Sequence, residues 1–369
     1  MSQPKTPTHE PLHPARLLLS AAVSAADFSR KFTPSLTHTP GLPAIDWAAV
    51  GLKAPQLLTA ASAQLPAADA VVITWAETEW AAMQHVFCSS ATSMPYSQRS
   101  TSSWSGWTKY ADGAPGSLGY WGYYRLVELG AAKVLLFKSN AHYAASQGEQ
   151  NLEALTNLLI EDVKPKLILS IGTAGGARTS DPVGTVNVVH SDALYESNAP
   201  QTGWPVYSSS WAPDWSIINN KSFANLLFPV PTTSSDLASI GSQFNKFYSS
   251  NYPLSELNPG NLNMGAAQPA INNLTPANIA LVTAKSFVVA NTSGNLSSFA
   301  CVEMDDAIIA RTAAGKTPFG SLRNISDPIQ NAALPERVQG NWGEAIYTAY
   351  GFYTSYNGAL AAAAVLSGT

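Results

Sequence analysis

The chain has 369 residues and a mass of 39.0 kDa, enough for one large domain or two modest domains, each with a proper core. Charged residues make up only 12% of it and the formal net charge is −4, so there is no basic field to attract a nucleic-acid backbone. No apolar run approaches the roughly 20 residues of a membrane span, and we therefore expect neither a nucleic-acid nor a membrane partner.

The first 66 residues are rich in Pro, Ala and Thr, and we interpret them as an N-terminal extension with helical pieces at 15–32 and 47–64. Residues 15–26 combine a basic residue, a short apolar stretch and small residues, which are the features of a weak signal peptide. Serine interrupts the apolar stretch and Glu10 precedes it, so an amphipathic helix explains the same residues. We predict a cytoplasmic protein, with secretion as the alternative.

The main domain, residues 67–369, is predicted to begin with a continuous apolar strand at 68–75. A strand without polar alternation is typical of a parallel sheet that is buried on both faces. A helix follows at 76–83 and carries Glu77 and Glu79 at its amino end. Further along, a strand at 133–137 leads into a polar helix at 146–163.

A buried strand from residue 166 is predicted to run into a glycine-rich turn at 172–176. Gly172, Gly175 and Gly176 would let the backbone approach a ligand closely and leave amides free as donors. The spacing is neither that of a dinucleotide fingerprint nor that of a P-loop. Another strand is expected at 183–189.

Two insertions interrupt this pattern, at about 89–122 and 195–276. The first is rich in Ser, Gly, Trp and Tyr, and it is either a hairpin that packs its own aromatics or a flap over a ligand. The second is long and loop-like, and we expect it to cap the core. Cys88 and Cys301 form no disulfide framework, and the histidines lack the spacing of metal ligands, so we expect no metal and no other cofactor.

The stretch 300–327 predicts a strand at 300–304, a helix at 307–311 and a strand at 319–327, followed by a final helix at 342–366. Carboxylates lie at the end of each strand, namely Glu303, Asp305 and Asp306 after the first and Asp327 after the second. Such carboxylates are often only helix-dipole or turn residues. In open α/β sheets, however, ligands bind beyond the carboxyl ends of the strands.

Several segments in this order resemble the purine nucleoside phosphorylase and nucleosidase superfamily, and most closely its methylthioadenosine/S-adenosylhomocysteine nucleosidases. The matching segments are 71–79, 171–176, 183–186, 286–287, 302–305 and 323–327. The resemblance covers about 68–190 and 277–366. It implies an α/β fold of the three-layer αβα phosphorylase type with a central mixed, largely parallel sheet. It also implies a small-molecule purine nucleoside as ligand and a homo-oligomer, either a dimer or a trimer or hexamer.

The resemblance also implies roles for single residues. Asp327 matches the general acid that protonates the departing purine, and Glu79 matches the glutamate that holds and activates the attacking water. Both roles fit the chemistry, since the reaction passes through an oxocarbenium-like sugar with a poor leaving group. Phe287 matches the aromatic side chain that stacks on the base. Thr173, with the amides around Ala174 and Gly175, would line the pocket.

Met304 and Asp305 match the family's Met-Glu pair, in which methionine packs on the sugar and the acid accepts hydrogen bonds from the ribose hydroxyls. Because aspartate is one methylene shorter than glutamate, Asp306 and Glu303 are alternative ligands of the sugar.

Hydrolysis is favoured over phosphorolysis, because the positions where phosphorylases of the superfamily carry an arginine and a Gly-Asp-Pro loop hold Ser170 and residues 75–78 here. The first hypothesis is therefore a purine nucleosidase that hydrolyses the N-glycosidic bond of an adenine-type nucleoside. A phosphorylase or ribosyl transferase is the alternative enzyme, with Arg125, Arg178 or Arg311 as phosphate ligands. A non-catalytic nucleoside-binding or sensing protein is the third reading.

Overall fold

The computed structural model describes residues 32–59, 64–101, 103–219, 221–258, 268–285, 296–329 and 334–368. In chain order the strands are β1 (Gln56–Leu58), β2 (Ala70–Thr74), β3 (Thr108–Tyr110), β4 (Gly122–Leu129), β5 (Ala132–Ser139), β6 (Leu167–Gly176), β7 (Val186–Val189), β8 (Ser191–Leu194), β9 (Val206–Ser208), β10 (Ile271–Asn273), β11 (Leu281–Thr283), β12 (Val302–Glu303) and β13 (Phe319–Pro328).

The α-helices are α2 (Glu77–Cys88), α3 (Gly148–Leu158), α4 (Lys221–Ala224), α5 (Ser234–Tyr248), α6 (Leu254–Leu257), α8 (Asp306–Ala313) and α9 (Glu336–Leu366). Short 3₁₀ turns lie at Ala48–Val50, Tyr96–Gln98 and Gln201–Gly203, and a π-helical turn at Leu159–Val163 extends α3. No helix in these described segments is long and apolar enough to cross a membrane.

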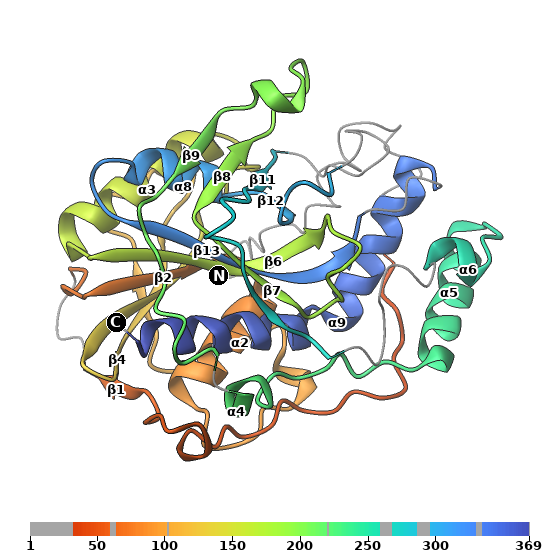
Figure 1. Cartoon of the computed structure of the whole chain (residues 1–369), viewed down its shortest axis with the longest axis horizontal. Helices are drawn as coiled ribbons and strands as arrows, with labels where there is room; N and C mark the ends of the chain where they lie inside the picture. The colour runs from red at the N-terminus through yellow and green to blue at the C-terminus, as the bar shows by residue number, and fades with distance from the viewer. Residues whose placement is uncertain are drawn as a thin grey trace, which may run out of the picture.

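The strands form one mixed sheet (Figure 1), whose main path is β1-β4-β5-β2-β6-β12-β11-β8-β9. At its centre β5, β2, β6 and β13 run parallel to one another. Antiparallel pairs lie outside them, for example β1 with β4 and β8 with β9. The predicted central mixed, largely parallel sheet is confirmed.

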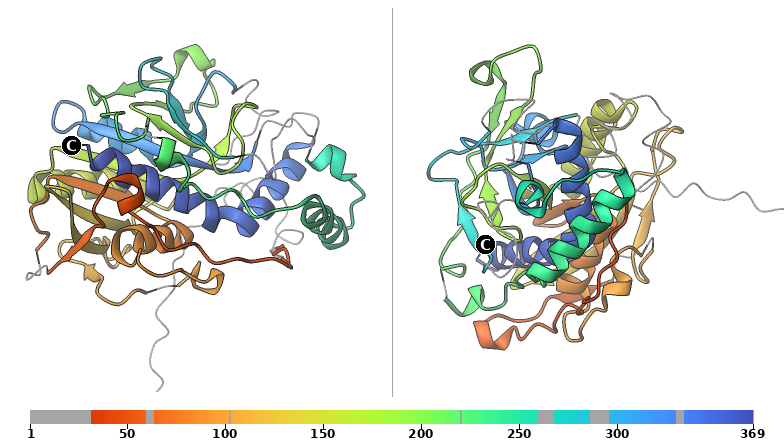
Figure 2. Two further views of the ribbon diagram at one scale, coloured as in Figure 1. Left: turned by 60° about the horizontal axis from the view of Figure 1, so that its bottom comes forward. Right: turned by 90° about the vertical axis from the view of Figure 1, so that its right-hand side faces the viewer.

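Helices cover both faces of the sheet (Figure 2), so that the fold has three layers. Along β2, Ala70 and Val72 belong to the core that includes α2 and α9, whereas Val71 and Ile73 belong to the core that includes α3 and α8. Successive side chains of a strand point to opposite faces. This two-sided burial explains why β2 has no polar alternation in its sequence.

Most elements of the main domain are where the sequence predicts them, but one prediction in the N-terminal extension and one in the main domain are wrong. The helix predicted over 47–64 is a 3₁₀ turn that ends at Gly51, with a φ of 73°, and then strand β1. The glycine-rich turn predicted at 172–176 is part of β6, because β13 pairs with β6 as far as Gly176. The sequence analysis also missed β4 and the helix α5 inside the second insertion.

Other predictions fall partly outside the described residues. Of the helix predicted at 15–32 only Phe32 is described, and Phe287 lies in a stretch that is not described. Within the first 66 residues, β1 pairs with β4 of the main sheet. The domain boundary near residue 66 stays a prediction.

Candidate active site

The carboxyl ends of the four parallel central strands meet at one edge of the sheet. Glu79 follows β2, His142 follows β5, Thr173 lies near the end of β6 and Asp327 near the end of β13. Strand β12 joins them, since Val302 pairs with Gly175. The topology therefore brings together most of the residues that the sequence analysis singled out, as expected for a doubly wound sheet.

Glu79 lies in the first turn of α2, is 4% exposed and accepts five hydrogen bonds. Thr173 donates to Oε1 from its N–H at 2.8 Å and from its Oγ1 at 2.7 Å. The N–H groups of Trp75 and Ala76 donate to Oε2 at 3.0 and 2.7 Å, and Thr74 Oγ1 donates at 2.8 Å. These bonds fix the carboxylate between the start of α2 and β6.

Burial raises the pKa of Glu79, but Arg323 and the N–H groups of Thr173 and Ala76 outweigh it, so the pKa lies below the ordinary value. Gly172 shows how close these charges come. A Cβ atom on Gly172 would lie 2.6 Å from Arg323 Nη1 and 2.9 Å from Glu79 Oε1. Only glycine allows the carboxylate and the guanidinium to lie together over this part of β6.

Arg323 lies in β13, is 3% exposed and is surrounded by acceptors. Its Nε donates to Asp306 Oδ2 at 2.7 Å and its Nη2 to Ser170 Oγ at 2.7 Å, while Nη2 also binds Asp306 Oδ1. Glu303 Oε2 is 3.0 Å from Nη2. This bidentate contact of Nε and Nη2 with the Asp306 carboxylate fixes the plane of the guanidinium. Nη1 then lies on the side of Gly172 and Glu79.

Glu303 caps the start of α8. Its carboxyl group accepts from the N–H of Asp305 at 2.7 Å and from that of Asp306 at 3.1 and 3.2 Å, and Thr283 Oγ1 also donates to it. Burial and the neighbouring Asp306 raise the pKa of Glu303 to about 8, although Arg323 opposes them. Glu303 therefore accepts hydrogen bonds from the first N–H groups of α8 and helps to hold the guanidinium of Arg323 in place.

Asp305 is 3% exposed and is held by the turn after β5. Its Oδ1 accepts from the N–H of Tyr143 at 2.9 Å and lies 3.6 Å from Nδ1 of His142. Burial raises the pKa of Asp305 to about 8 and lowers the pKa of His142 to about 4. Met304, just before Asp305, is also buried.

Asp327 is 2% exposed and lies just past an irregularity in the pairing of β13 with β6. Ser326 Oγ donates to its Oδ1 at 2.6 Å. Asp327 pairs with Gly175, where a Cβ atom would lie 3.5 Å from Asp327 Oδ2 and 2.7 Å from Ile329 Cγ2. The second glycine thus lets Asp327 and Ile329 lie close to the backbone of β6.

Three participants were missed as site residues by the sequence analysis, namely Ser170, Arg323 and His142, whereas Asp306 was named there as an alternative ligand of the sugar. A signal existed for two of them. Arg323 is a charged residue in an apolar strand close to several acids, and His142 follows directly after a predicted parallel strand. Among the described residues no group of His, Cys, Asp and Glu is arranged to hold a metal ion.

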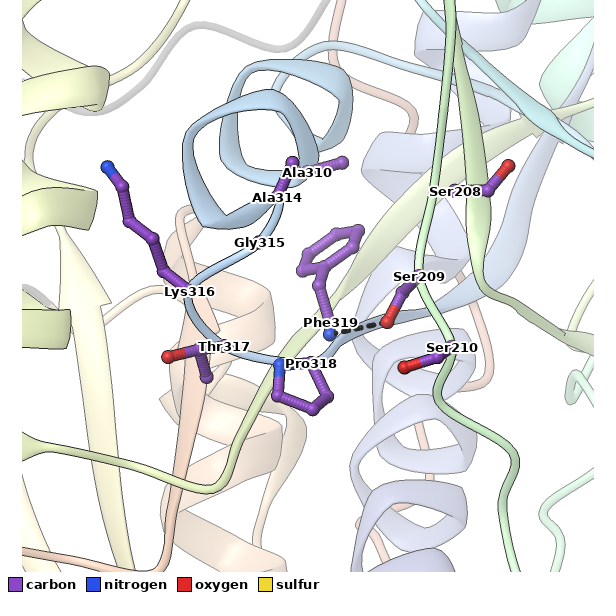
Figure 3. Close-up of a pocket in the computed structure, with 10 residues that line it drawn as sticks. All are labelled: Ser208, Ser209, Ser210, Ala310, Ala314, Gly315, Lys316, Thr317, Pro318 and Phe319. Atoms are coloured by element: carbon purple, nitrogen blue, oxygen red, sulfur yellow. Dashed lines mark hydrogen bonds between the residues drawn. The ribbon is translucent and has the colours of Figure 1, made fainter.

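A separate hollow of about 270 Å³ lies at the opposite edge of the sheet, where β13 begins (Figure 3). It is lined by Ser208, Ser209, Ser210, Ala310, Ala314, Gly315, Lys316, Thr317, Pro318 and Phe319. Ser209 Oγ accepts from the N–H of Phe319, and Lys316 points away from the serines and donates to Asn157. No carboxylate lines this hollow, so the acid–base groups belong to the other edge.

No family model matches the chain, and no curated protein matches it. Solved structures similar to it include a 5′-methylthioadenosine/S-adenosylhomocysteine nucleosidase from Neisseria meningitidis in complex with methylthio-immucillin-A, with a TM-score of 0.44, 15% identity and coverage of 82% of this chain and 100% of that one. A futalosine hydrolase of Helicobacter pylori has a TM-score of 0.43 and 13% identity, with coverage of 80% and 97%.

An S-adenosylhomocysteine nucleosidase from Streptococcus pyogenes, in complex with 5-methylthiotubericidin, has a TM-score of 0.43 and 14% identity, with coverage of 82% of this chain and 98% of that one. The first and third of these proteins are nucleosidases of the kind that the sequence segments resemble. Since these scores and identities are low, the function of this chain has to be inferred from its own side chains.

Proposed function

We propose that the chain is a purine nucleosidase that hydrolyses the N-glycosidic bond of an adenine-type nucleoside to free base and ribose or a substituted ribose. The observation that carries the proposal is the placement of two buried carboxyl groups, Glu79 and Asp327, beside the same segment of β6. Glu79 lies by Gly172 and Asp327 by Gly175. Three residues of strand span about 10 Å, which leaves room for a sugar, a water and a leaving base.

Asp327 is the proposed general acid. Cleavage of the glycosidic bond leaves electrons on the purine, and protonation of the base by a positioned carboxyl group lowers the barrier. Ser326 Oγ donates to Oδ1 and so holds the carboxyl group in one orientation. The proton donor then stands at the carboxyl end of β13, beside Gly175.

Glu79 and Arg323 are proposed to hold the attacking water. The lowered pKa of Glu79 keeps it ionised at neutral pH, as a base that accepts a proton from water must be. Arg323 Nη1 faces the same point above Gly172 and can orient the oxygen of that water. Thr173 fixes Glu79 from the other side.

Hydrolysis fits these charges better than phosphorolysis. Ser170, at the position of the family's phosphate arginine, is buried and bonded to Asp306 and Arg323. The arginines considered as alternative phosphate ligands contact other groups of the protein. Arg311 of α8 forms ion pairs with Glu149 and Glu153 of α3. Arg125 donates to Ser105 O and Gln84 Oε1, and Arg178 lies 3.6 Å from Asp181. A phosphate dianion in the site would be repelled by the Glu79 carboxylate, and none of these three arginines is placed to compensate that repulsion.

The remaining assignments are carried over from the resemblance as proposals. Asp305 and Met304 would bind the sugar, Phe287 would stack on the base, and Ala174 and Gly175 would line the pocket. We assign Glu303 and Asp306 to Arg323 and α8, because their oxygens contact those groups. A homo-oligomer and a cytoplasmic location stay predictions.

The test is release of free base from adenosine, methylthioadenosine, S-adenosylhomocysteine, AMP and inosine, each with and without phosphate, measured by chromatography. We expect release without phosphate from at least one adenine nucleoside. Asp327→Asn should lower kcat at least about 100-fold, since general acid catalysis contributes that much or more. Glu79→Gln should also lower kcat.

The matched control is Asp112→Asn, which changes an exposed aspartate in a turn and should leave release unchanged. Base release that needs phosphate would contradict hydrolysis and favour the phosphorylase. Binding of a nucleoside without turnover, unchanged in Asp327→Asn, would favour the sensing protein.

A further inference from the structure

We propose that His142 determines sugar specificity: its Nε2–H donates to a hydroxyl of the ribose that Asp305 also binds, so that the site selects ribonucleosides over deoxyribonucleosides. The inference rests on the proposed function and adds a residue to it. Neither the composition nor the resemblance assigned a role to His142.

The position of the proton on His142 follows from its neighbours. The N–H of Ala144 lies 3.1 Å from Nδ1, and since a backbone N–H can only donate, Nδ1 accepts. A neutral imidazole then carries its hydrogen on Nε2. Burial lowers the pKa of His142 to about 4, which keeps the ring neutral at physiological pH. Nε2 is therefore a hydrogen-bond donor.

His142 and Asp305 are held side by side by the same turn. Asp305 Oδ1 accepts from the N–H of Tyr143, the residue after His142, and lies 3.6 Å from His142 Nδ1. Asp305 Oδ2 and His142 Nε2 take part in none of the hydrogen bonds found among the described residues. His142 is 9% and Asp305 3% exposed, so a donor and an acceptor that no described residue engages belong to neighbouring buried residues.

His142 and Asp305 lie near two of the proposed catalytic groups, because Glu79 and Arg323 shift the pKa values of both residues. Glu79 raises the pKa of His142 against the effect of burial, whereas Arg323 and Lys138 lower it further, so the imidazole is within electrostatic reach of all three. His142 follows β5 and Glu79 follows β2, and these strands are parallel neighbours. The imidazole and Glu79 therefore lie at the same edge of the sheet, at the ends of neighbouring strands.

A vicinal diol suits this pair of groups. Each hydroxyl can donate to a carboxyl oxygen and accept from an N–H. The alternative sugar ligands, Glu303 and Asp306, are engaged with α8 and Arg323. Asp305 alone is short and has one oxygen committed to Tyr143, so His142 supplies the second contact that the diol needs.

The experiment compares kcat/KM for adenosine, 2′-deoxyadenosine and 3′-deoxyadenosine in the wild type, His142→Phe and His142→Gln. The wild type should prefer adenosine to at least one deoxy substrate by about 10- to 100-fold, the effect of one lost hydrogen bond in a buried site. His142→Phe should reduce that preference towards 1 by slowing adenosine, with the affected deoxy substrate changed less than about threefold. His142→Gln, which keeps an N–H donor, should restore part of it.

His38→Phe is the matched control, since His38 is exposed, and it should leave all three values unchanged. An equal loss for all three substrates in His142→Phe and His142→Gln would mean that His142 only supports the fold, and would overturn the inference. An unchanged preference in His142→Phe would overturn it as well, while the nucleosidase proposal would stand. If the wild type cleaves no nucleoside, both proposals are wrong.

Discussion

At the scale of single residues, the site is organised around the buried guanidinium of Arg323, which lies among several acids. Arg323 is the partner of Asp306 and lies beside Glu79, and burial raises the pKa values of Glu303 and Asp305 to about 8. The pKa of Glu79 is lowered instead, by Arg323 and by the N–H groups that donate to it, so Glu79 is ionised at neutral pH. The lowered pKa of Glu79 gives it the charge that a base requires, whereas the raised pKa values of Glu303 and Asp305 reflect their burial.

The neutral state of His142 predicts a pH dependence of stability. Its pKa is about 4 in the folded chain and 6.5 in the unfolded chain, so between these values the unfolded state binds the extra proton. The free energy of unfolding therefore falls as the pH drops from 6.5 to about 4, by at most about 3 kcal/mol. His142→Gln should lack this part of the fall.

Urea denaturation at pH 7.5, 5.5 and 4.5 measures the difference in the free energy of unfolding between the wild type and His142→Gln. At pH 7.5 the imidazole is neutral in both states, so the difference found there is the baseline. A constant offset between the two proteins over the whole range would show that His142 does not change its charge on unfolding in the way proposed.

At the scale of elements, the second insertion is anchored on the strand that carries Arg323 and Asp327. The ring of Trp211 lies on Gly320 of β13, where a Cβ atom would be 2.2 Å from Trp211 Cε3. The carbonyl of Trp211 also contacts His190 Nδ1 at 2.8 Å. The chain between β9 and α4 therefore packs on β13 close to its start.

Gly320→Ala should lower the free energy of unfolding by about 1–3 kcal/mol, because overpacking forces the indole or the strand to move. The double variant Gly320→Ala, Trp211→Ala should be less destabilised than the sum of the two single variants, as measured by urea denaturation. Gly116→Ala is the control, since a Cβ atom there meets nothing within 4 Å. Strict additivity in the cycle would contradict the packing described here.

At the scale of the whole molecule, residues 32–58 contact elements that are far apart along the chain, namely α5, α9 and β4 (Figure 2). Phe32 packs edge-on against Phe244 of α5, with ring centroids 6.0 Å apart. Tyr353 Oη of α9 donates to Pro40 O at 2.9 Å. Strand β1 extends the sheet beyond β4. This segment is part of the folded core even though the sequence marks it as an extension.

Deletion of residues 1–66 should therefore prevent folding or lower Tm by more than about 10 °C. It removes several buried side chains, each worth roughly 1.5–3 kcal/mol, from a total stability of about 5–15 kcal/mol. The lost buried side chains are Phe32, Leu42, Ile45, Trp47, Val50 and Leu65. The control is a chain that begins at residue 32, which keeps every contact described above. If the chain without residues 1–66 and the chain that begins at residue 32 had equal Tm values, residues 32–66 would be an extension that does not stabilise the main domain.

The sequence by itself determined the parallel strands, the covering helices and the positions of Glu79 and Asp327 at strand ends. Those features depend on local patterns, since apolar runs such as 68–75 and helix stops such as Gly315 and Pro318 act over a few residues. The carboxyl ends of neighbouring parallel strands meet at one edge, so the general place of the site followed from the order of the elements.

Only the tertiary structure decided which side chains touch. That β13 pairs with β6 as far as Gly176, and so extends the predicted turn into a strand, depends on residues about 150 positions apart along the chain. The same register sets Arg323 beside Glu79, engages Glu303 with α8, and places His142 next to Asp305. Such contacts arise from long-range pairing and burial, which no local pattern encodes, and they separate the groups that support the site from those that would meet a substrate.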